Sequence, residues 1–216
     1  MRIAATNLKI GYKGREVHPG LTFSLKEGEL VCLMGLNGAG KSTLIKTLCG
    51  TLNPLGGDLT VEGVIGVVLT EKTNAGGLSV YDLVSLGRYR QSGFFGKLSK
   101  ADHEAVREAL RAVGMEHKSE SHVSQLSDGE RQKAFIAKAL AQECDTMILD
   151  EPTAFLDVRS RRETMELLRD LAHESGKAVL VSTHDLDLAK TYSDRIWLLS
   201  PESPLITDGD PDEFFE

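Results

Sequence analysis

Residues 35–42 read GLNGAGKS, which is the spacing of a phosphate-binding loop, G-x-x-x-x-G-K-[ST]. The loop follows an apolar segment, ELVCLM at 29–34, and precedes a helical pattern, KSTLIKTLCG. Glycines allow successive backbone N–H groups to turn towards phosphate oxygens, and the N-terminus of the next helix adds a favourable dipole. A glycine-rich turn without a ligand is the alternative, but the strand-then-helix context favours phosphate binding. The residues predicted to contact a nucleotide are Gly35, Asn37, Gly38, Ala39, Gly40, Lys41, Ser42 and Thr43.

Within this loop, Lys41 is expected to reach the β- and γ-phosphates, and the Ser42 hydroxyl to ligate Mg²⁺. Two adjacent acids end another apolar segment, MILDEP at 147–152. Ligands of a parallel sheet gather at the carboxyl ends of its strands, so these acids are expected beside the phosphate loop. Successive strand residues face opposite ways. We therefore expect Asp150 to contribute to the Mg²⁺ site and Glu151 to polarise an attacking water as a general base.

The composition limits the classes of protein that this chain can be. Its 216 residues, 41% hydrophobic, suit a single globular domain. Lysine and arginine number 25 against 32 acids, which gives a net charge of −7 and argues against a nucleic-acid partner. The three cysteines are far apart and lack metal-ligand spacing, so a reducing cytosol fits best. The apolar runs are much shorter than the roughly 18 residues of a membrane span, so any membrane role is expected to be peripheral.

The hydrophobic pattern predicts an α/β fold with three parts. Residues 1–30 alternate short β-prone pieces with glycine-rich turns, which indicates an antiparallel β layer. Strand patterns at 29–34, 57–69, 146–150, 177–183 and 195–200 alternate with helices and predict a mostly parallel sheet. A helical segment is inserted at about 78–141. The expected organisation is one domain, 1–216, in which 1–77 and 142–216 form a nucleotide-binding core and 78–141 a helical subdomain.

The order of the motifs GLNGAGKS, LSDGE (126–130), MILDEP, FLD and a histidine after a strand resembles the ATP-binding-cassette (ABC) ATPases over nearly the whole chain. The resemblance implies a P-loop NTPase core of the RecA-like type. It also implies a head-to-tail dimer with a second copy of the chain, in which each ATP lies between one subunit's phosphate loop and the other's LSDGE, here called the signature loop. Ser127 and Gly129 would face the γ-phosphate of the partner's ATP, and Glu130 belongs to the same loop.

The resemblance implies three further roles. Asp157 in TAFLD would be a dimer contact, and it is equally suited to cap the helix VRSRRETMELL. His184 in VSTHD would contact the γ-phosphate as a catalytic residue, and Tyr12 in IGYKG would stack on adenine. The alternatives are an incidental histidine and an ordinary core or surface tyrosine.

Two positions depart from the family pattern. The family usually has a glutamine after the strand that precedes the helical segment, whereas this chain has VVLTEKTN at 67–74; Thr70, with Glu71 next to it, is nearest by position to a metal ligand. The family more often has glycine where Asp128 stands. Ser127 and Glu130 predict a capping box, whose helix N-terminus would point at a phosphate. Because an acid facing ATP would repel it, we expect the Asp128 carboxylate to turn towards solvent or towards a basic group across the dimer.

The segment 78–106 and the sequence VVLTEKT resemble the ATP-binding subunits of importers for ferric siderophores, haem and cobalamin. This implies integral-membrane permease subunits as partners, with a substrate-binding protein upstream, and a peripheral location at the cytoplasmic face of the cell membrane. Tyr89, Phe94 and Phe95 are candidate coupling contacts, with subdomain core as the alternative. A soluble ABC ATPase of iron–sulfur cluster assembly would share every motif. A DNA-repair ABC protein is disfavoured by the acidic charge, and a module without turnover by Glu151.

Overall fold

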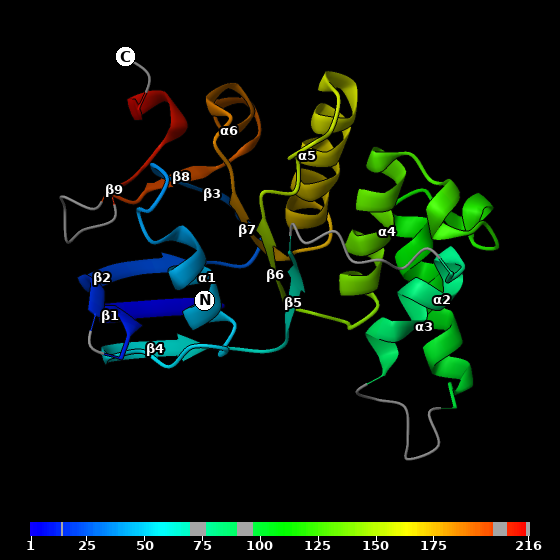
Figure 1. The fold of residues 1–216 in the computed structure, drawn as a ribbon, viewed down its shortest axis with the longest axis horizontal. Coiled ribbons are helices and arrows are strands. Elements are labelled where there is room, and N and C mark those ends of the chain that lie inside the picture. The colour runs from blue at the N-terminus through cyan, green and yellow to red at the C-terminus, as the bar shows by residue number, and fades with distance from the viewer. Residues whose placement is uncertain (14, 70–76, 90–96, 201–206, 215–216) are drawn as a thin grey trace.

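The computed structural model describes residues 1–13, 15–69, 77–89, 97–200 and 207–214. At its centre is a six-stranded sheet in the order β5-β6-β7-β3-β8-β9 (Figure 1). The strands are β3 (Leu30–Met34), β5 (Ile65–Val68), β6 (Thr146–Asp150), β7 (Ala178–Ser182), β8 (Arg195–Leu198) and β9 (Thr207–Gly209). All neighbours pair in parallel except β8 and β9. The expected mostly parallel sheet is therefore confirmed, and β9 is a strand that the sequence pattern did not predict.

A smaller antiparallel sheet forms the N-terminal layer. The prediction for residues 1–30 is confirmed, but a third strand comes from the start of the 57–69 pattern, which was expected in the parallel sheet; it pairs with the N-terminal strand instead. The layer contains β1 (Ile3–Tyr12), β2 (Arg15–Leu25) and β4 (Gly56–Val61) in the order β2-β1-β4. Helix α1 (Lys41–Leu48) leaves the phosphate loop and packs on β1. The carboxyl end of β3, from which the loop starts, thereby lies close to the β1–β2 layer.

The helices fall into two groups, which Figure 1 separates clearly. Helices α5 (Val158–His173) and α6 (Leu186–Tyr192) accompany the strands of the parallel sheet. Helices α2 (Val80–Ser85), α3 (Lys100–Ala112) and α4 (Asp128–Leu140) gather at one side and pack on one another, and α4 also contacts α5. Short 3₁₀ turns occur at Leu86–Arg88, Glu116–Lys118, Val123–Gln125 and Pro211–Phe214. None of the described helices is long and apolar enough to cross a membrane.

Both faces of the parallel sheet are buried, and alternate residues of β3 show this directly. Val31 and Leu33 pack with α1 and the antiparallel layer, whereas Cys32 and Met34 pack with α5, α6 and the helices of 78–141. The strand is therefore a continuous apolar run, as expected for a central parallel strand. The thiol of Cys32 is fully buried, which raises its pKa to about 12. All three cysteines are free, in agreement with the absence of a predicted disulfide.

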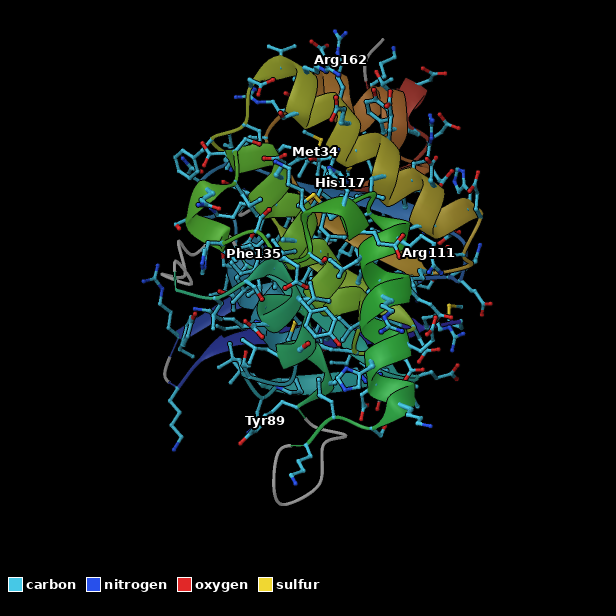
Figure 2. All side chains as sticks on the ribbon, turned by 90° about the vertical axis from the view of Figure 1, so that its right-hand side faces the viewer. Met34, Tyr89, Arg111, His117, Phe135 and Arg162 are labelled. Atoms are coloured by element: carbon cyan, nitrogen blue, oxygen red, sulfur yellow. The ribbon has the colours of Figure 1, made fainter. Side chains whose placement is uncertain are left out.

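Tyr89, one of the aromatic side chains proposed as coupling contacts, follows the 3₁₀ turn Leu86–Arg88 of the helical subdomain. Tyr89 is 72% exposed and lies at the periphery of the view in Figure 2, below α2 and α3. It is therefore not part of the subdomain core, which was the alternative. Phe94 and Phe95 lie outside the described residues. The neighbouring Arg88 is buried and forms ion pairs with Asp102 of α3 and with Glu143, which lies just after α4. These ion pairs fix the backbone next to Tyr89 to both helices.

Candidate nucleotide-binding site

The phosphate loop turns sharply between β3 and α1, and its glycines make the turn possible. Gly38 and Gly40 have φ values of 83° and 95°, a left-handed conformation that side chains disfavour. A Cβ atom at Gly40 would lie only 2.7 Å from Val17 Cγ1. Beneath the loop, the buried His18 places Nε2 2.7 Å from the carbonyl oxygen of Ala39. His18 therefore fixes the loop from β2, and no local sequence pattern indicated this role.

Lys41 is almost buried and its ammonium group lies inside the loop. Nζ donates hydrogen bonds to the carbonyl oxygens of Gly35 at 2.7 Å and Leu36 at 3.3 Å. Desolvation lowers the pKa of Lys41, and the charges of Glu151 and Asp150 oppose this effect. A cation held only by neutral carbonyl groups and near two acids is well placed to bind an incoming phosphate.

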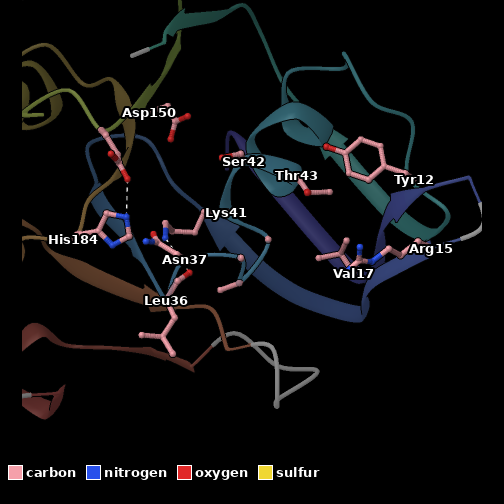
Figure 3. A pocket seen from close by; sticks show the side chains of 14 residues that line it. Tyr12, Arg15, Val17, Leu36, Asn37, Lys41, Ser42, Thr43, Asp150 and His184 are labelled. Carbon is pink, nitrogen blue, oxygen red and sulfur yellow. Dashed lines mark hydrogen bonds and ion pairs between the residues drawn. The ribbon is translucent and has the colours of Figure 1, made fainter. Parts of the chain in front are cut away.

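A cavity of about 480 Å³ opens above the loop (Figure 3). The structure brings most of the predicted residues together around it. Its lining comprises Tyr12, Arg15, Val17, Leu36, Asn37, Gly38, Ala39, Gly40, Lys41, Ser42, Thr43, Asp150, Glu151 and His184. Gly35 takes part through the carbonyl group that binds Lys41.

The two acids at the end of β6 are held by a serine of the neighbouring strand. Asp150 pairs in register with Ser182, the last residue of β7. The buried Ser182 hydroxyl donates to Asp150 Oδ1 at 2.6 Å and accepts from the backbone N–H of Glu151 at 2.9 Å. Glu151 has a φ of 47°, a strained conformation for a residue with a side chain. Ser182 therefore helps to maintain this conformation; its only signal in the sequence was its place two residues before His184.

The side chain of His184 contacts the proposed general base directly. Its Nε2 lies 2.6 Å from Glu151 Oε1 (Figure 3), and both side chains are partly exposed towards the cavity. The carboxylate is thus oriented by the imidazole on one side and by its own backbone geometry on the other. An oriented carboxylate beside a phosphate-binding loop can accept a proton from water.

The other end of the cavity can accept a flat aromatic group. Tyr12 is 46% exposed and lies across the cavity from His184, as Figure 3 shows. Val17 and the guanidinium-bearing Arg15 line the same end. An exposed tyrosine ring next to an apolar valine offers a surface on which a purine can stack. Arg15 was not among the predicted residues because an isolated arginine has no distinguishing pattern.

Oxygen atoms suited to Mg²⁺ lie at the phosphate end. Ser42 and Asp150 both line the cavity, and hydroxyl and carboxylate oxygens are ligands that Mg²⁺ prefers. Among the described residues there is no group of three or more histidine, cysteine, aspartate or glutamate side chains that could hold a metal. The two oxygen-bearing side chains of Ser42 and Asp150 fit a Mg²⁺ ion that takes its other ligands from water and from a bound phosphate. Thr70 and Glu71, the other metal-ligand candidates, lie outside the described residues.

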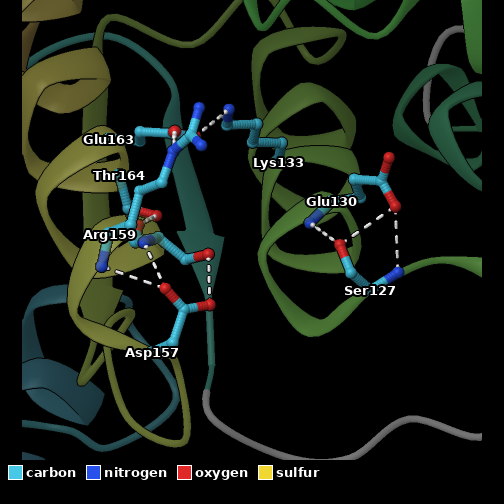
Figure 4. A network of polar contacts seen from close by, with 8 residues as sticks. Ser127, Glu130, Lys133, Asp157, Arg159, Glu163 and Thr164 are labelled. Carbon is cyan, nitrogen blue, oxygen red and sulfur yellow. Dashed lines mark hydrogen bonds and ion pairs between the residues drawn. The ribbon is translucent and has the colours of Figure 1, made fainter.

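The signature loop lies away from this cavity, at the N-terminus of α4. The predicted capping box is confirmed: the Glu130 N–H donates to Ser127 Oγ, and the Ser127 N–H donates to Glu130 Oε2 at 2.9 Å (Figure 4). The backbone N–H of Ser127, with Lys118 and the Ser127 hydroxyl, lowers the pKa of Glu130 to about 2. Ser127, Gly129 and Glu130 do not line the cavity that holds the phosphate loop.

Asp128 turns its carboxylate towards solvent, as one of the two expectations required, and its side chain is 64% exposed. Its Oδ1 also accepts a hydrogen bond of 2.8 Å from Arg131 Nη1 on the same helix, a partner that was not predicted. The local partner is available because residues three apart lie on one face of a helix. Arg131 also donates to the carbonyl oxygen of Leu126, which closes the loop on itself.

Asp157 caps the N-terminus of α5, which is one of its two expected roles. Its Oδ1 accepts from the backbone N–H groups of Arg159 at 2.9 Å and Ser160 at 3.0 Å, and its Oδ2 from the Ser160 hydroxyl at 2.8 Å (Figure 4). These bonds lower the pKa of Asp157, the Ser160 N–H most strongly. Its role as a dimer contact stays a prediction.

The sequence profile of the ABC transporter family matches residues 19–154. An uncharacterized ABC transporter ATP-binding protein of Methanocaldococcus jannaschii is 40% identical over 206 residues, 89% of this chain and 71% of that protein. The ferric enterobactin transport ATP-binding protein of Escherichia coli is 35% identical over 98% of this chain and 83% of its own length. The manganese transport system ATP-binding protein of Bacillus subtilis is 38% identical over 89% of this chain and 81% of its own.

Solved structures agree with these relatives. One, described as an inward-facing conformation of an ABC transporter of the metal-chelate type, superposes with a TM-score of 0.91 at 30% identity and covers 99% of this chain and 85% of that one. Another is a dimeric ATP-binding cassette in a post-hydrolysis state with ADP and phosphate, with a TM-score of 0.78 at 25% identity over 97% of this chain and 98% of that one. The phosphate loop, the two acids and the histidine therefore lie in a fold that known ATP-binding cassettes share. The chain belongs to the ABC transporter family as an ATP-hydrolysing ATP-binding cassette.

Proposed function

We propose that this chain is the ATP-hydrolysing subunit of an importer for a metal ion or a metal chelate such as an iron-siderophore or haem. It would act as a dimer on integral-membrane permease subunits, bound peripherally at the cytoplasmic face, with a substrate-binding protein upstream. The observation that carries the proposal is a division of the site. The cavity contains the phosphate loop, Asp150, Glu151 and His184, but not Ser127 or Gly129 of the signature loop. A second subunit is needed to bring a signature loop to each nucleotide.

Each residue of the cavity has a distinct task in this proposal. The backbone N–H groups of the loop and Lys41 bind the phosphates, and Tyr12 stacks on adenine. Glu151 accepts a proton from a water that attacks the γ-phosphorus, and ADP leaves. His184 orients the Glu151 carboxylate through their 2.6 Å contact. It lines the same cavity as the phosphate loop and would contact the γ-phosphate there.

Mg²⁺ would be held by Ser42 and Asp150 and would supply positive charge that offsets the negative charge of the phosphates. The hydroxyl of Ser182 donates to Asp150 Oδ1 and so orients this carboxylate. In the dimer, the capped N-terminus of α4 in one subunit would present its positive dipole to the γ-phosphate held by the other. Asp157 would lie in the same interface.

In this proposal the two parts of the chain have different tasks. Residues 1–77 and 142–216 would form the nucleotide-binding core, and 78–141 the subdomain that carries the signature loop. Exposed Tyr89, at the end of this subdomain, would be one of the contacts with the permease. The transport names of the iron-chelate and manganese relatives support import over the alternative, a soluble ABC ATPase that serves iron–sulfur cluster assembly.

The test is a pull-down from detergent-solubilised membranes with the Glu151→Gln variant and ATP. Without its general base the variant should keep ATP bound and remain a dimer, so that its partners are retained. Recovery of a multi-span membrane protein is the expected result. Recovery of soluble partners alone would overturn the transport proposal. Glu151→Gln combined with Ser127→Arg is the matched control, because it keeps the ATP cavity and places a bulky cation in the proposed sandwich.

A further inference from the structure

Gly129 of α4 lies against Ser160 of α5. A Cβ atom added at Gly129 would be 2.8 Å from Ser160 Oγ, closer than real Cβ contacts occur, and 3.0 Å from Ser160 Cβ, which is tighter than most of them. Gly129 lies inside α4 and has an ordinary helical backbone, so conformational freedom does not explain the glycine. The space next to Gly129 is occupied by the side chain of Ser160, so a larger residue at 129 would displace Ser160 or α4.

Ser160 is itself held in place by Asp157. Its hydroxyl donates to Asp157 Oδ2 and its N–H donates to Asp157 Oδ1, so the atom above Gly129 cannot move independently of the cap of α5. The signature loop and Asp157, which are far apart in the sequence, are thereby connected through a single side chain.

A second contact lies one turn further along both helices. Lys133 of α4 donates from Nζ to Glu163 Oε2 at 3.0 Å, and Arg159 donates to the other carboxylate oxygen at 2.8 Å (Figure 4). Lys133 is four residues after Gly129, and Glu163 three after Ser160, so each pair shares a helix face. Lys133 first, and Arg159 second, lower the pKa of Glu163. Two contacts a turn apart fix both the separation and the rotation of the helices.

We infer that α5 positions the signature loop, with Ser160, Glu163 and Lys133 as positioning residues. Ser127, Gly129 and Asp157 then form one rigid surface that is presented as a unit to the partner's nucleotide. The segment 152–157 joins α5 directly to Glu151, so this surface is also tied to the catalytic edge of the sheet. The inference rests on the proposed ATP-sandwich dimer. Its alternative is that Gly129 is required only because the partner's ATP approaches it.

Suppression of a Gly129 variant distinguishes the two explanations. Gly129→Ala should lower kcat for ATP hydrolysis by at least about tenfold, because a shift of about 1 Å can cost as much as a hundredfold. If Ser160 is the obstacle, Ser160→Gly should restore kcat in the double variant to within about threefold of Ser160→Gly alone. Ser160→Ala, which removes Oγ but keeps Cβ, should restore it partially.

The control for this series is Ser193→Gly, a serine whose hydroxyl bonds to Ala189 at the end of α6, outside this contact. It should not rescue Gly129→Ala. If Ser160→Gly leaves the Gly129→Ala variant as inactive as before, the glycine is needed for the partner's nucleotide and the inference is wrong.

The ion pair is tested separately with Lys133→Met, which keeps the length of the side chain but removes its charge. We expect kcat to fall by about tenfold, the Kd of the monomer for ATP to stay within about twofold, and Lys133→Arg to restore most of the activity. Arg107→Met is the matched control, because its ion pair with Glu104 is exposed and local to α3. A purely structural role would lower Tm without this split between kcat and Kd, and would contradict the inference.

Dimer formation by Glu151→Gln in ATP separates this inference from the proposed function. If Glu151→Gln stays monomeric by light scattering, the proposed sandwich dimer fails. The positioning role alone is wrong if Glu151→Gln dimerises and two further results are found. The first is that adding Lys133→Met to Glu151→Gln leaves dimerisation unchanged. The second is that Lys133→Met by itself leaves the kcat of the otherwise wild-type protein unchanged.

Discussion

Ser182 and Asp150 are joined by a hydrogen bond of 2.6 Å, in which the serine hydroxyl donates to Oδ1 of the aspartate. The parallel pairing of β6 with β7 sets these residues opposite each other. The same hydroxyl oxygen accepts the N–H of Glu151, whose φ of 47° is strained. One buried hydroxyl therefore contacts both acids, the proposed Mg²⁺ ligand and the proposed general base.

We predict that Ser182→Ala lowers kcat by about tenfold or more, because Asp150 loses a donor and Glu151 loses an acceptor in a buried position. The KM for ATP should change less, since the phosphate loop is untouched. Steady-state kinetics and thermal unfolding provide the measurements. Ser193→Ala removes a hydroxyl that bonds to Ala189 at the end of α6 and lies next to the Cys32 thiol, away from both acids, and is the control. A Ser182→Ala variant with unchanged kcat would contradict the positioning role of this hydroxyl.

Lys41→Ala is expected to abolish ATP binding. The ammonium group is nearly buried and donates hydrogen bonds to two carbonyl groups of the loop. The other cationic side chain that lines the cavity, Arg15, would not replace it in the variant. Fluorescent-nucleotide titration of the purified variant measures the effect, and Lys46→Ala on the same helix provides the control. Retention of wild-type affinity by Lys41→Ala would overturn the assignment of the loop.

Asp128→Gly should have little effect on activity. The carboxylate is paired with Arg131 on its own helix and is largely exposed, and such a pair contributes little to stability. We expect ATP affinity and ATP-driven dimerisation to stay within about twofold of wild type, and Tm to fall by no more than about 4 °C. Isothermal titration and light scattering are the measurements. A large gain in ATP affinity would show that the acid faces the nucleotide in the dimer.

The capping box of α4 makes the stability of the folded chain depend on pH under acidic conditions. The pKa of Glu130 is lowered from 4.5 to about 2 in the folded chain, so its contribution is complete above pH 4.5 and is lost as the pH falls towards 2. Glu130→Gln should therefore have a lower Tm than wild type at neutral pH, and the difference should shrink over that window. Glu108→Gln, an exposed change on α3, is the control. A Tm difference that is constant with pH would show that the charge of Glu130 is not the cause.

Local patterns in the sequence were sufficient for most of the elements, but not for β9 or for the sheet to which β4 belongs, and for most of the cavity. The phosphate loop needs a strand before it and a helix after it, and both are visible as runs of residues. The capping box of α4 and the Asp157 cap also follow from spacing alone, because their partners lie two or three residues away. Motif order then placed Asp150, Glu151 and His184 at one edge of a parallel sheet, where the structure has them.

The tertiary structure decided the contacts between residues that are distant along the chain. His18 under the phosphate loop and Ser182 beside Asp150 depend on how sheets and strands are aligned, which no spacing in the sequence records. The contacts of Gly129 with Ser160 and of Lys133 with Glu163 depend on how α4 packs against α5. The sequence by itself determined which chemistry this protein carries; the packing of its elements decided how each group is held, because the geometry between elements is set by long-range burial and not by local spacing.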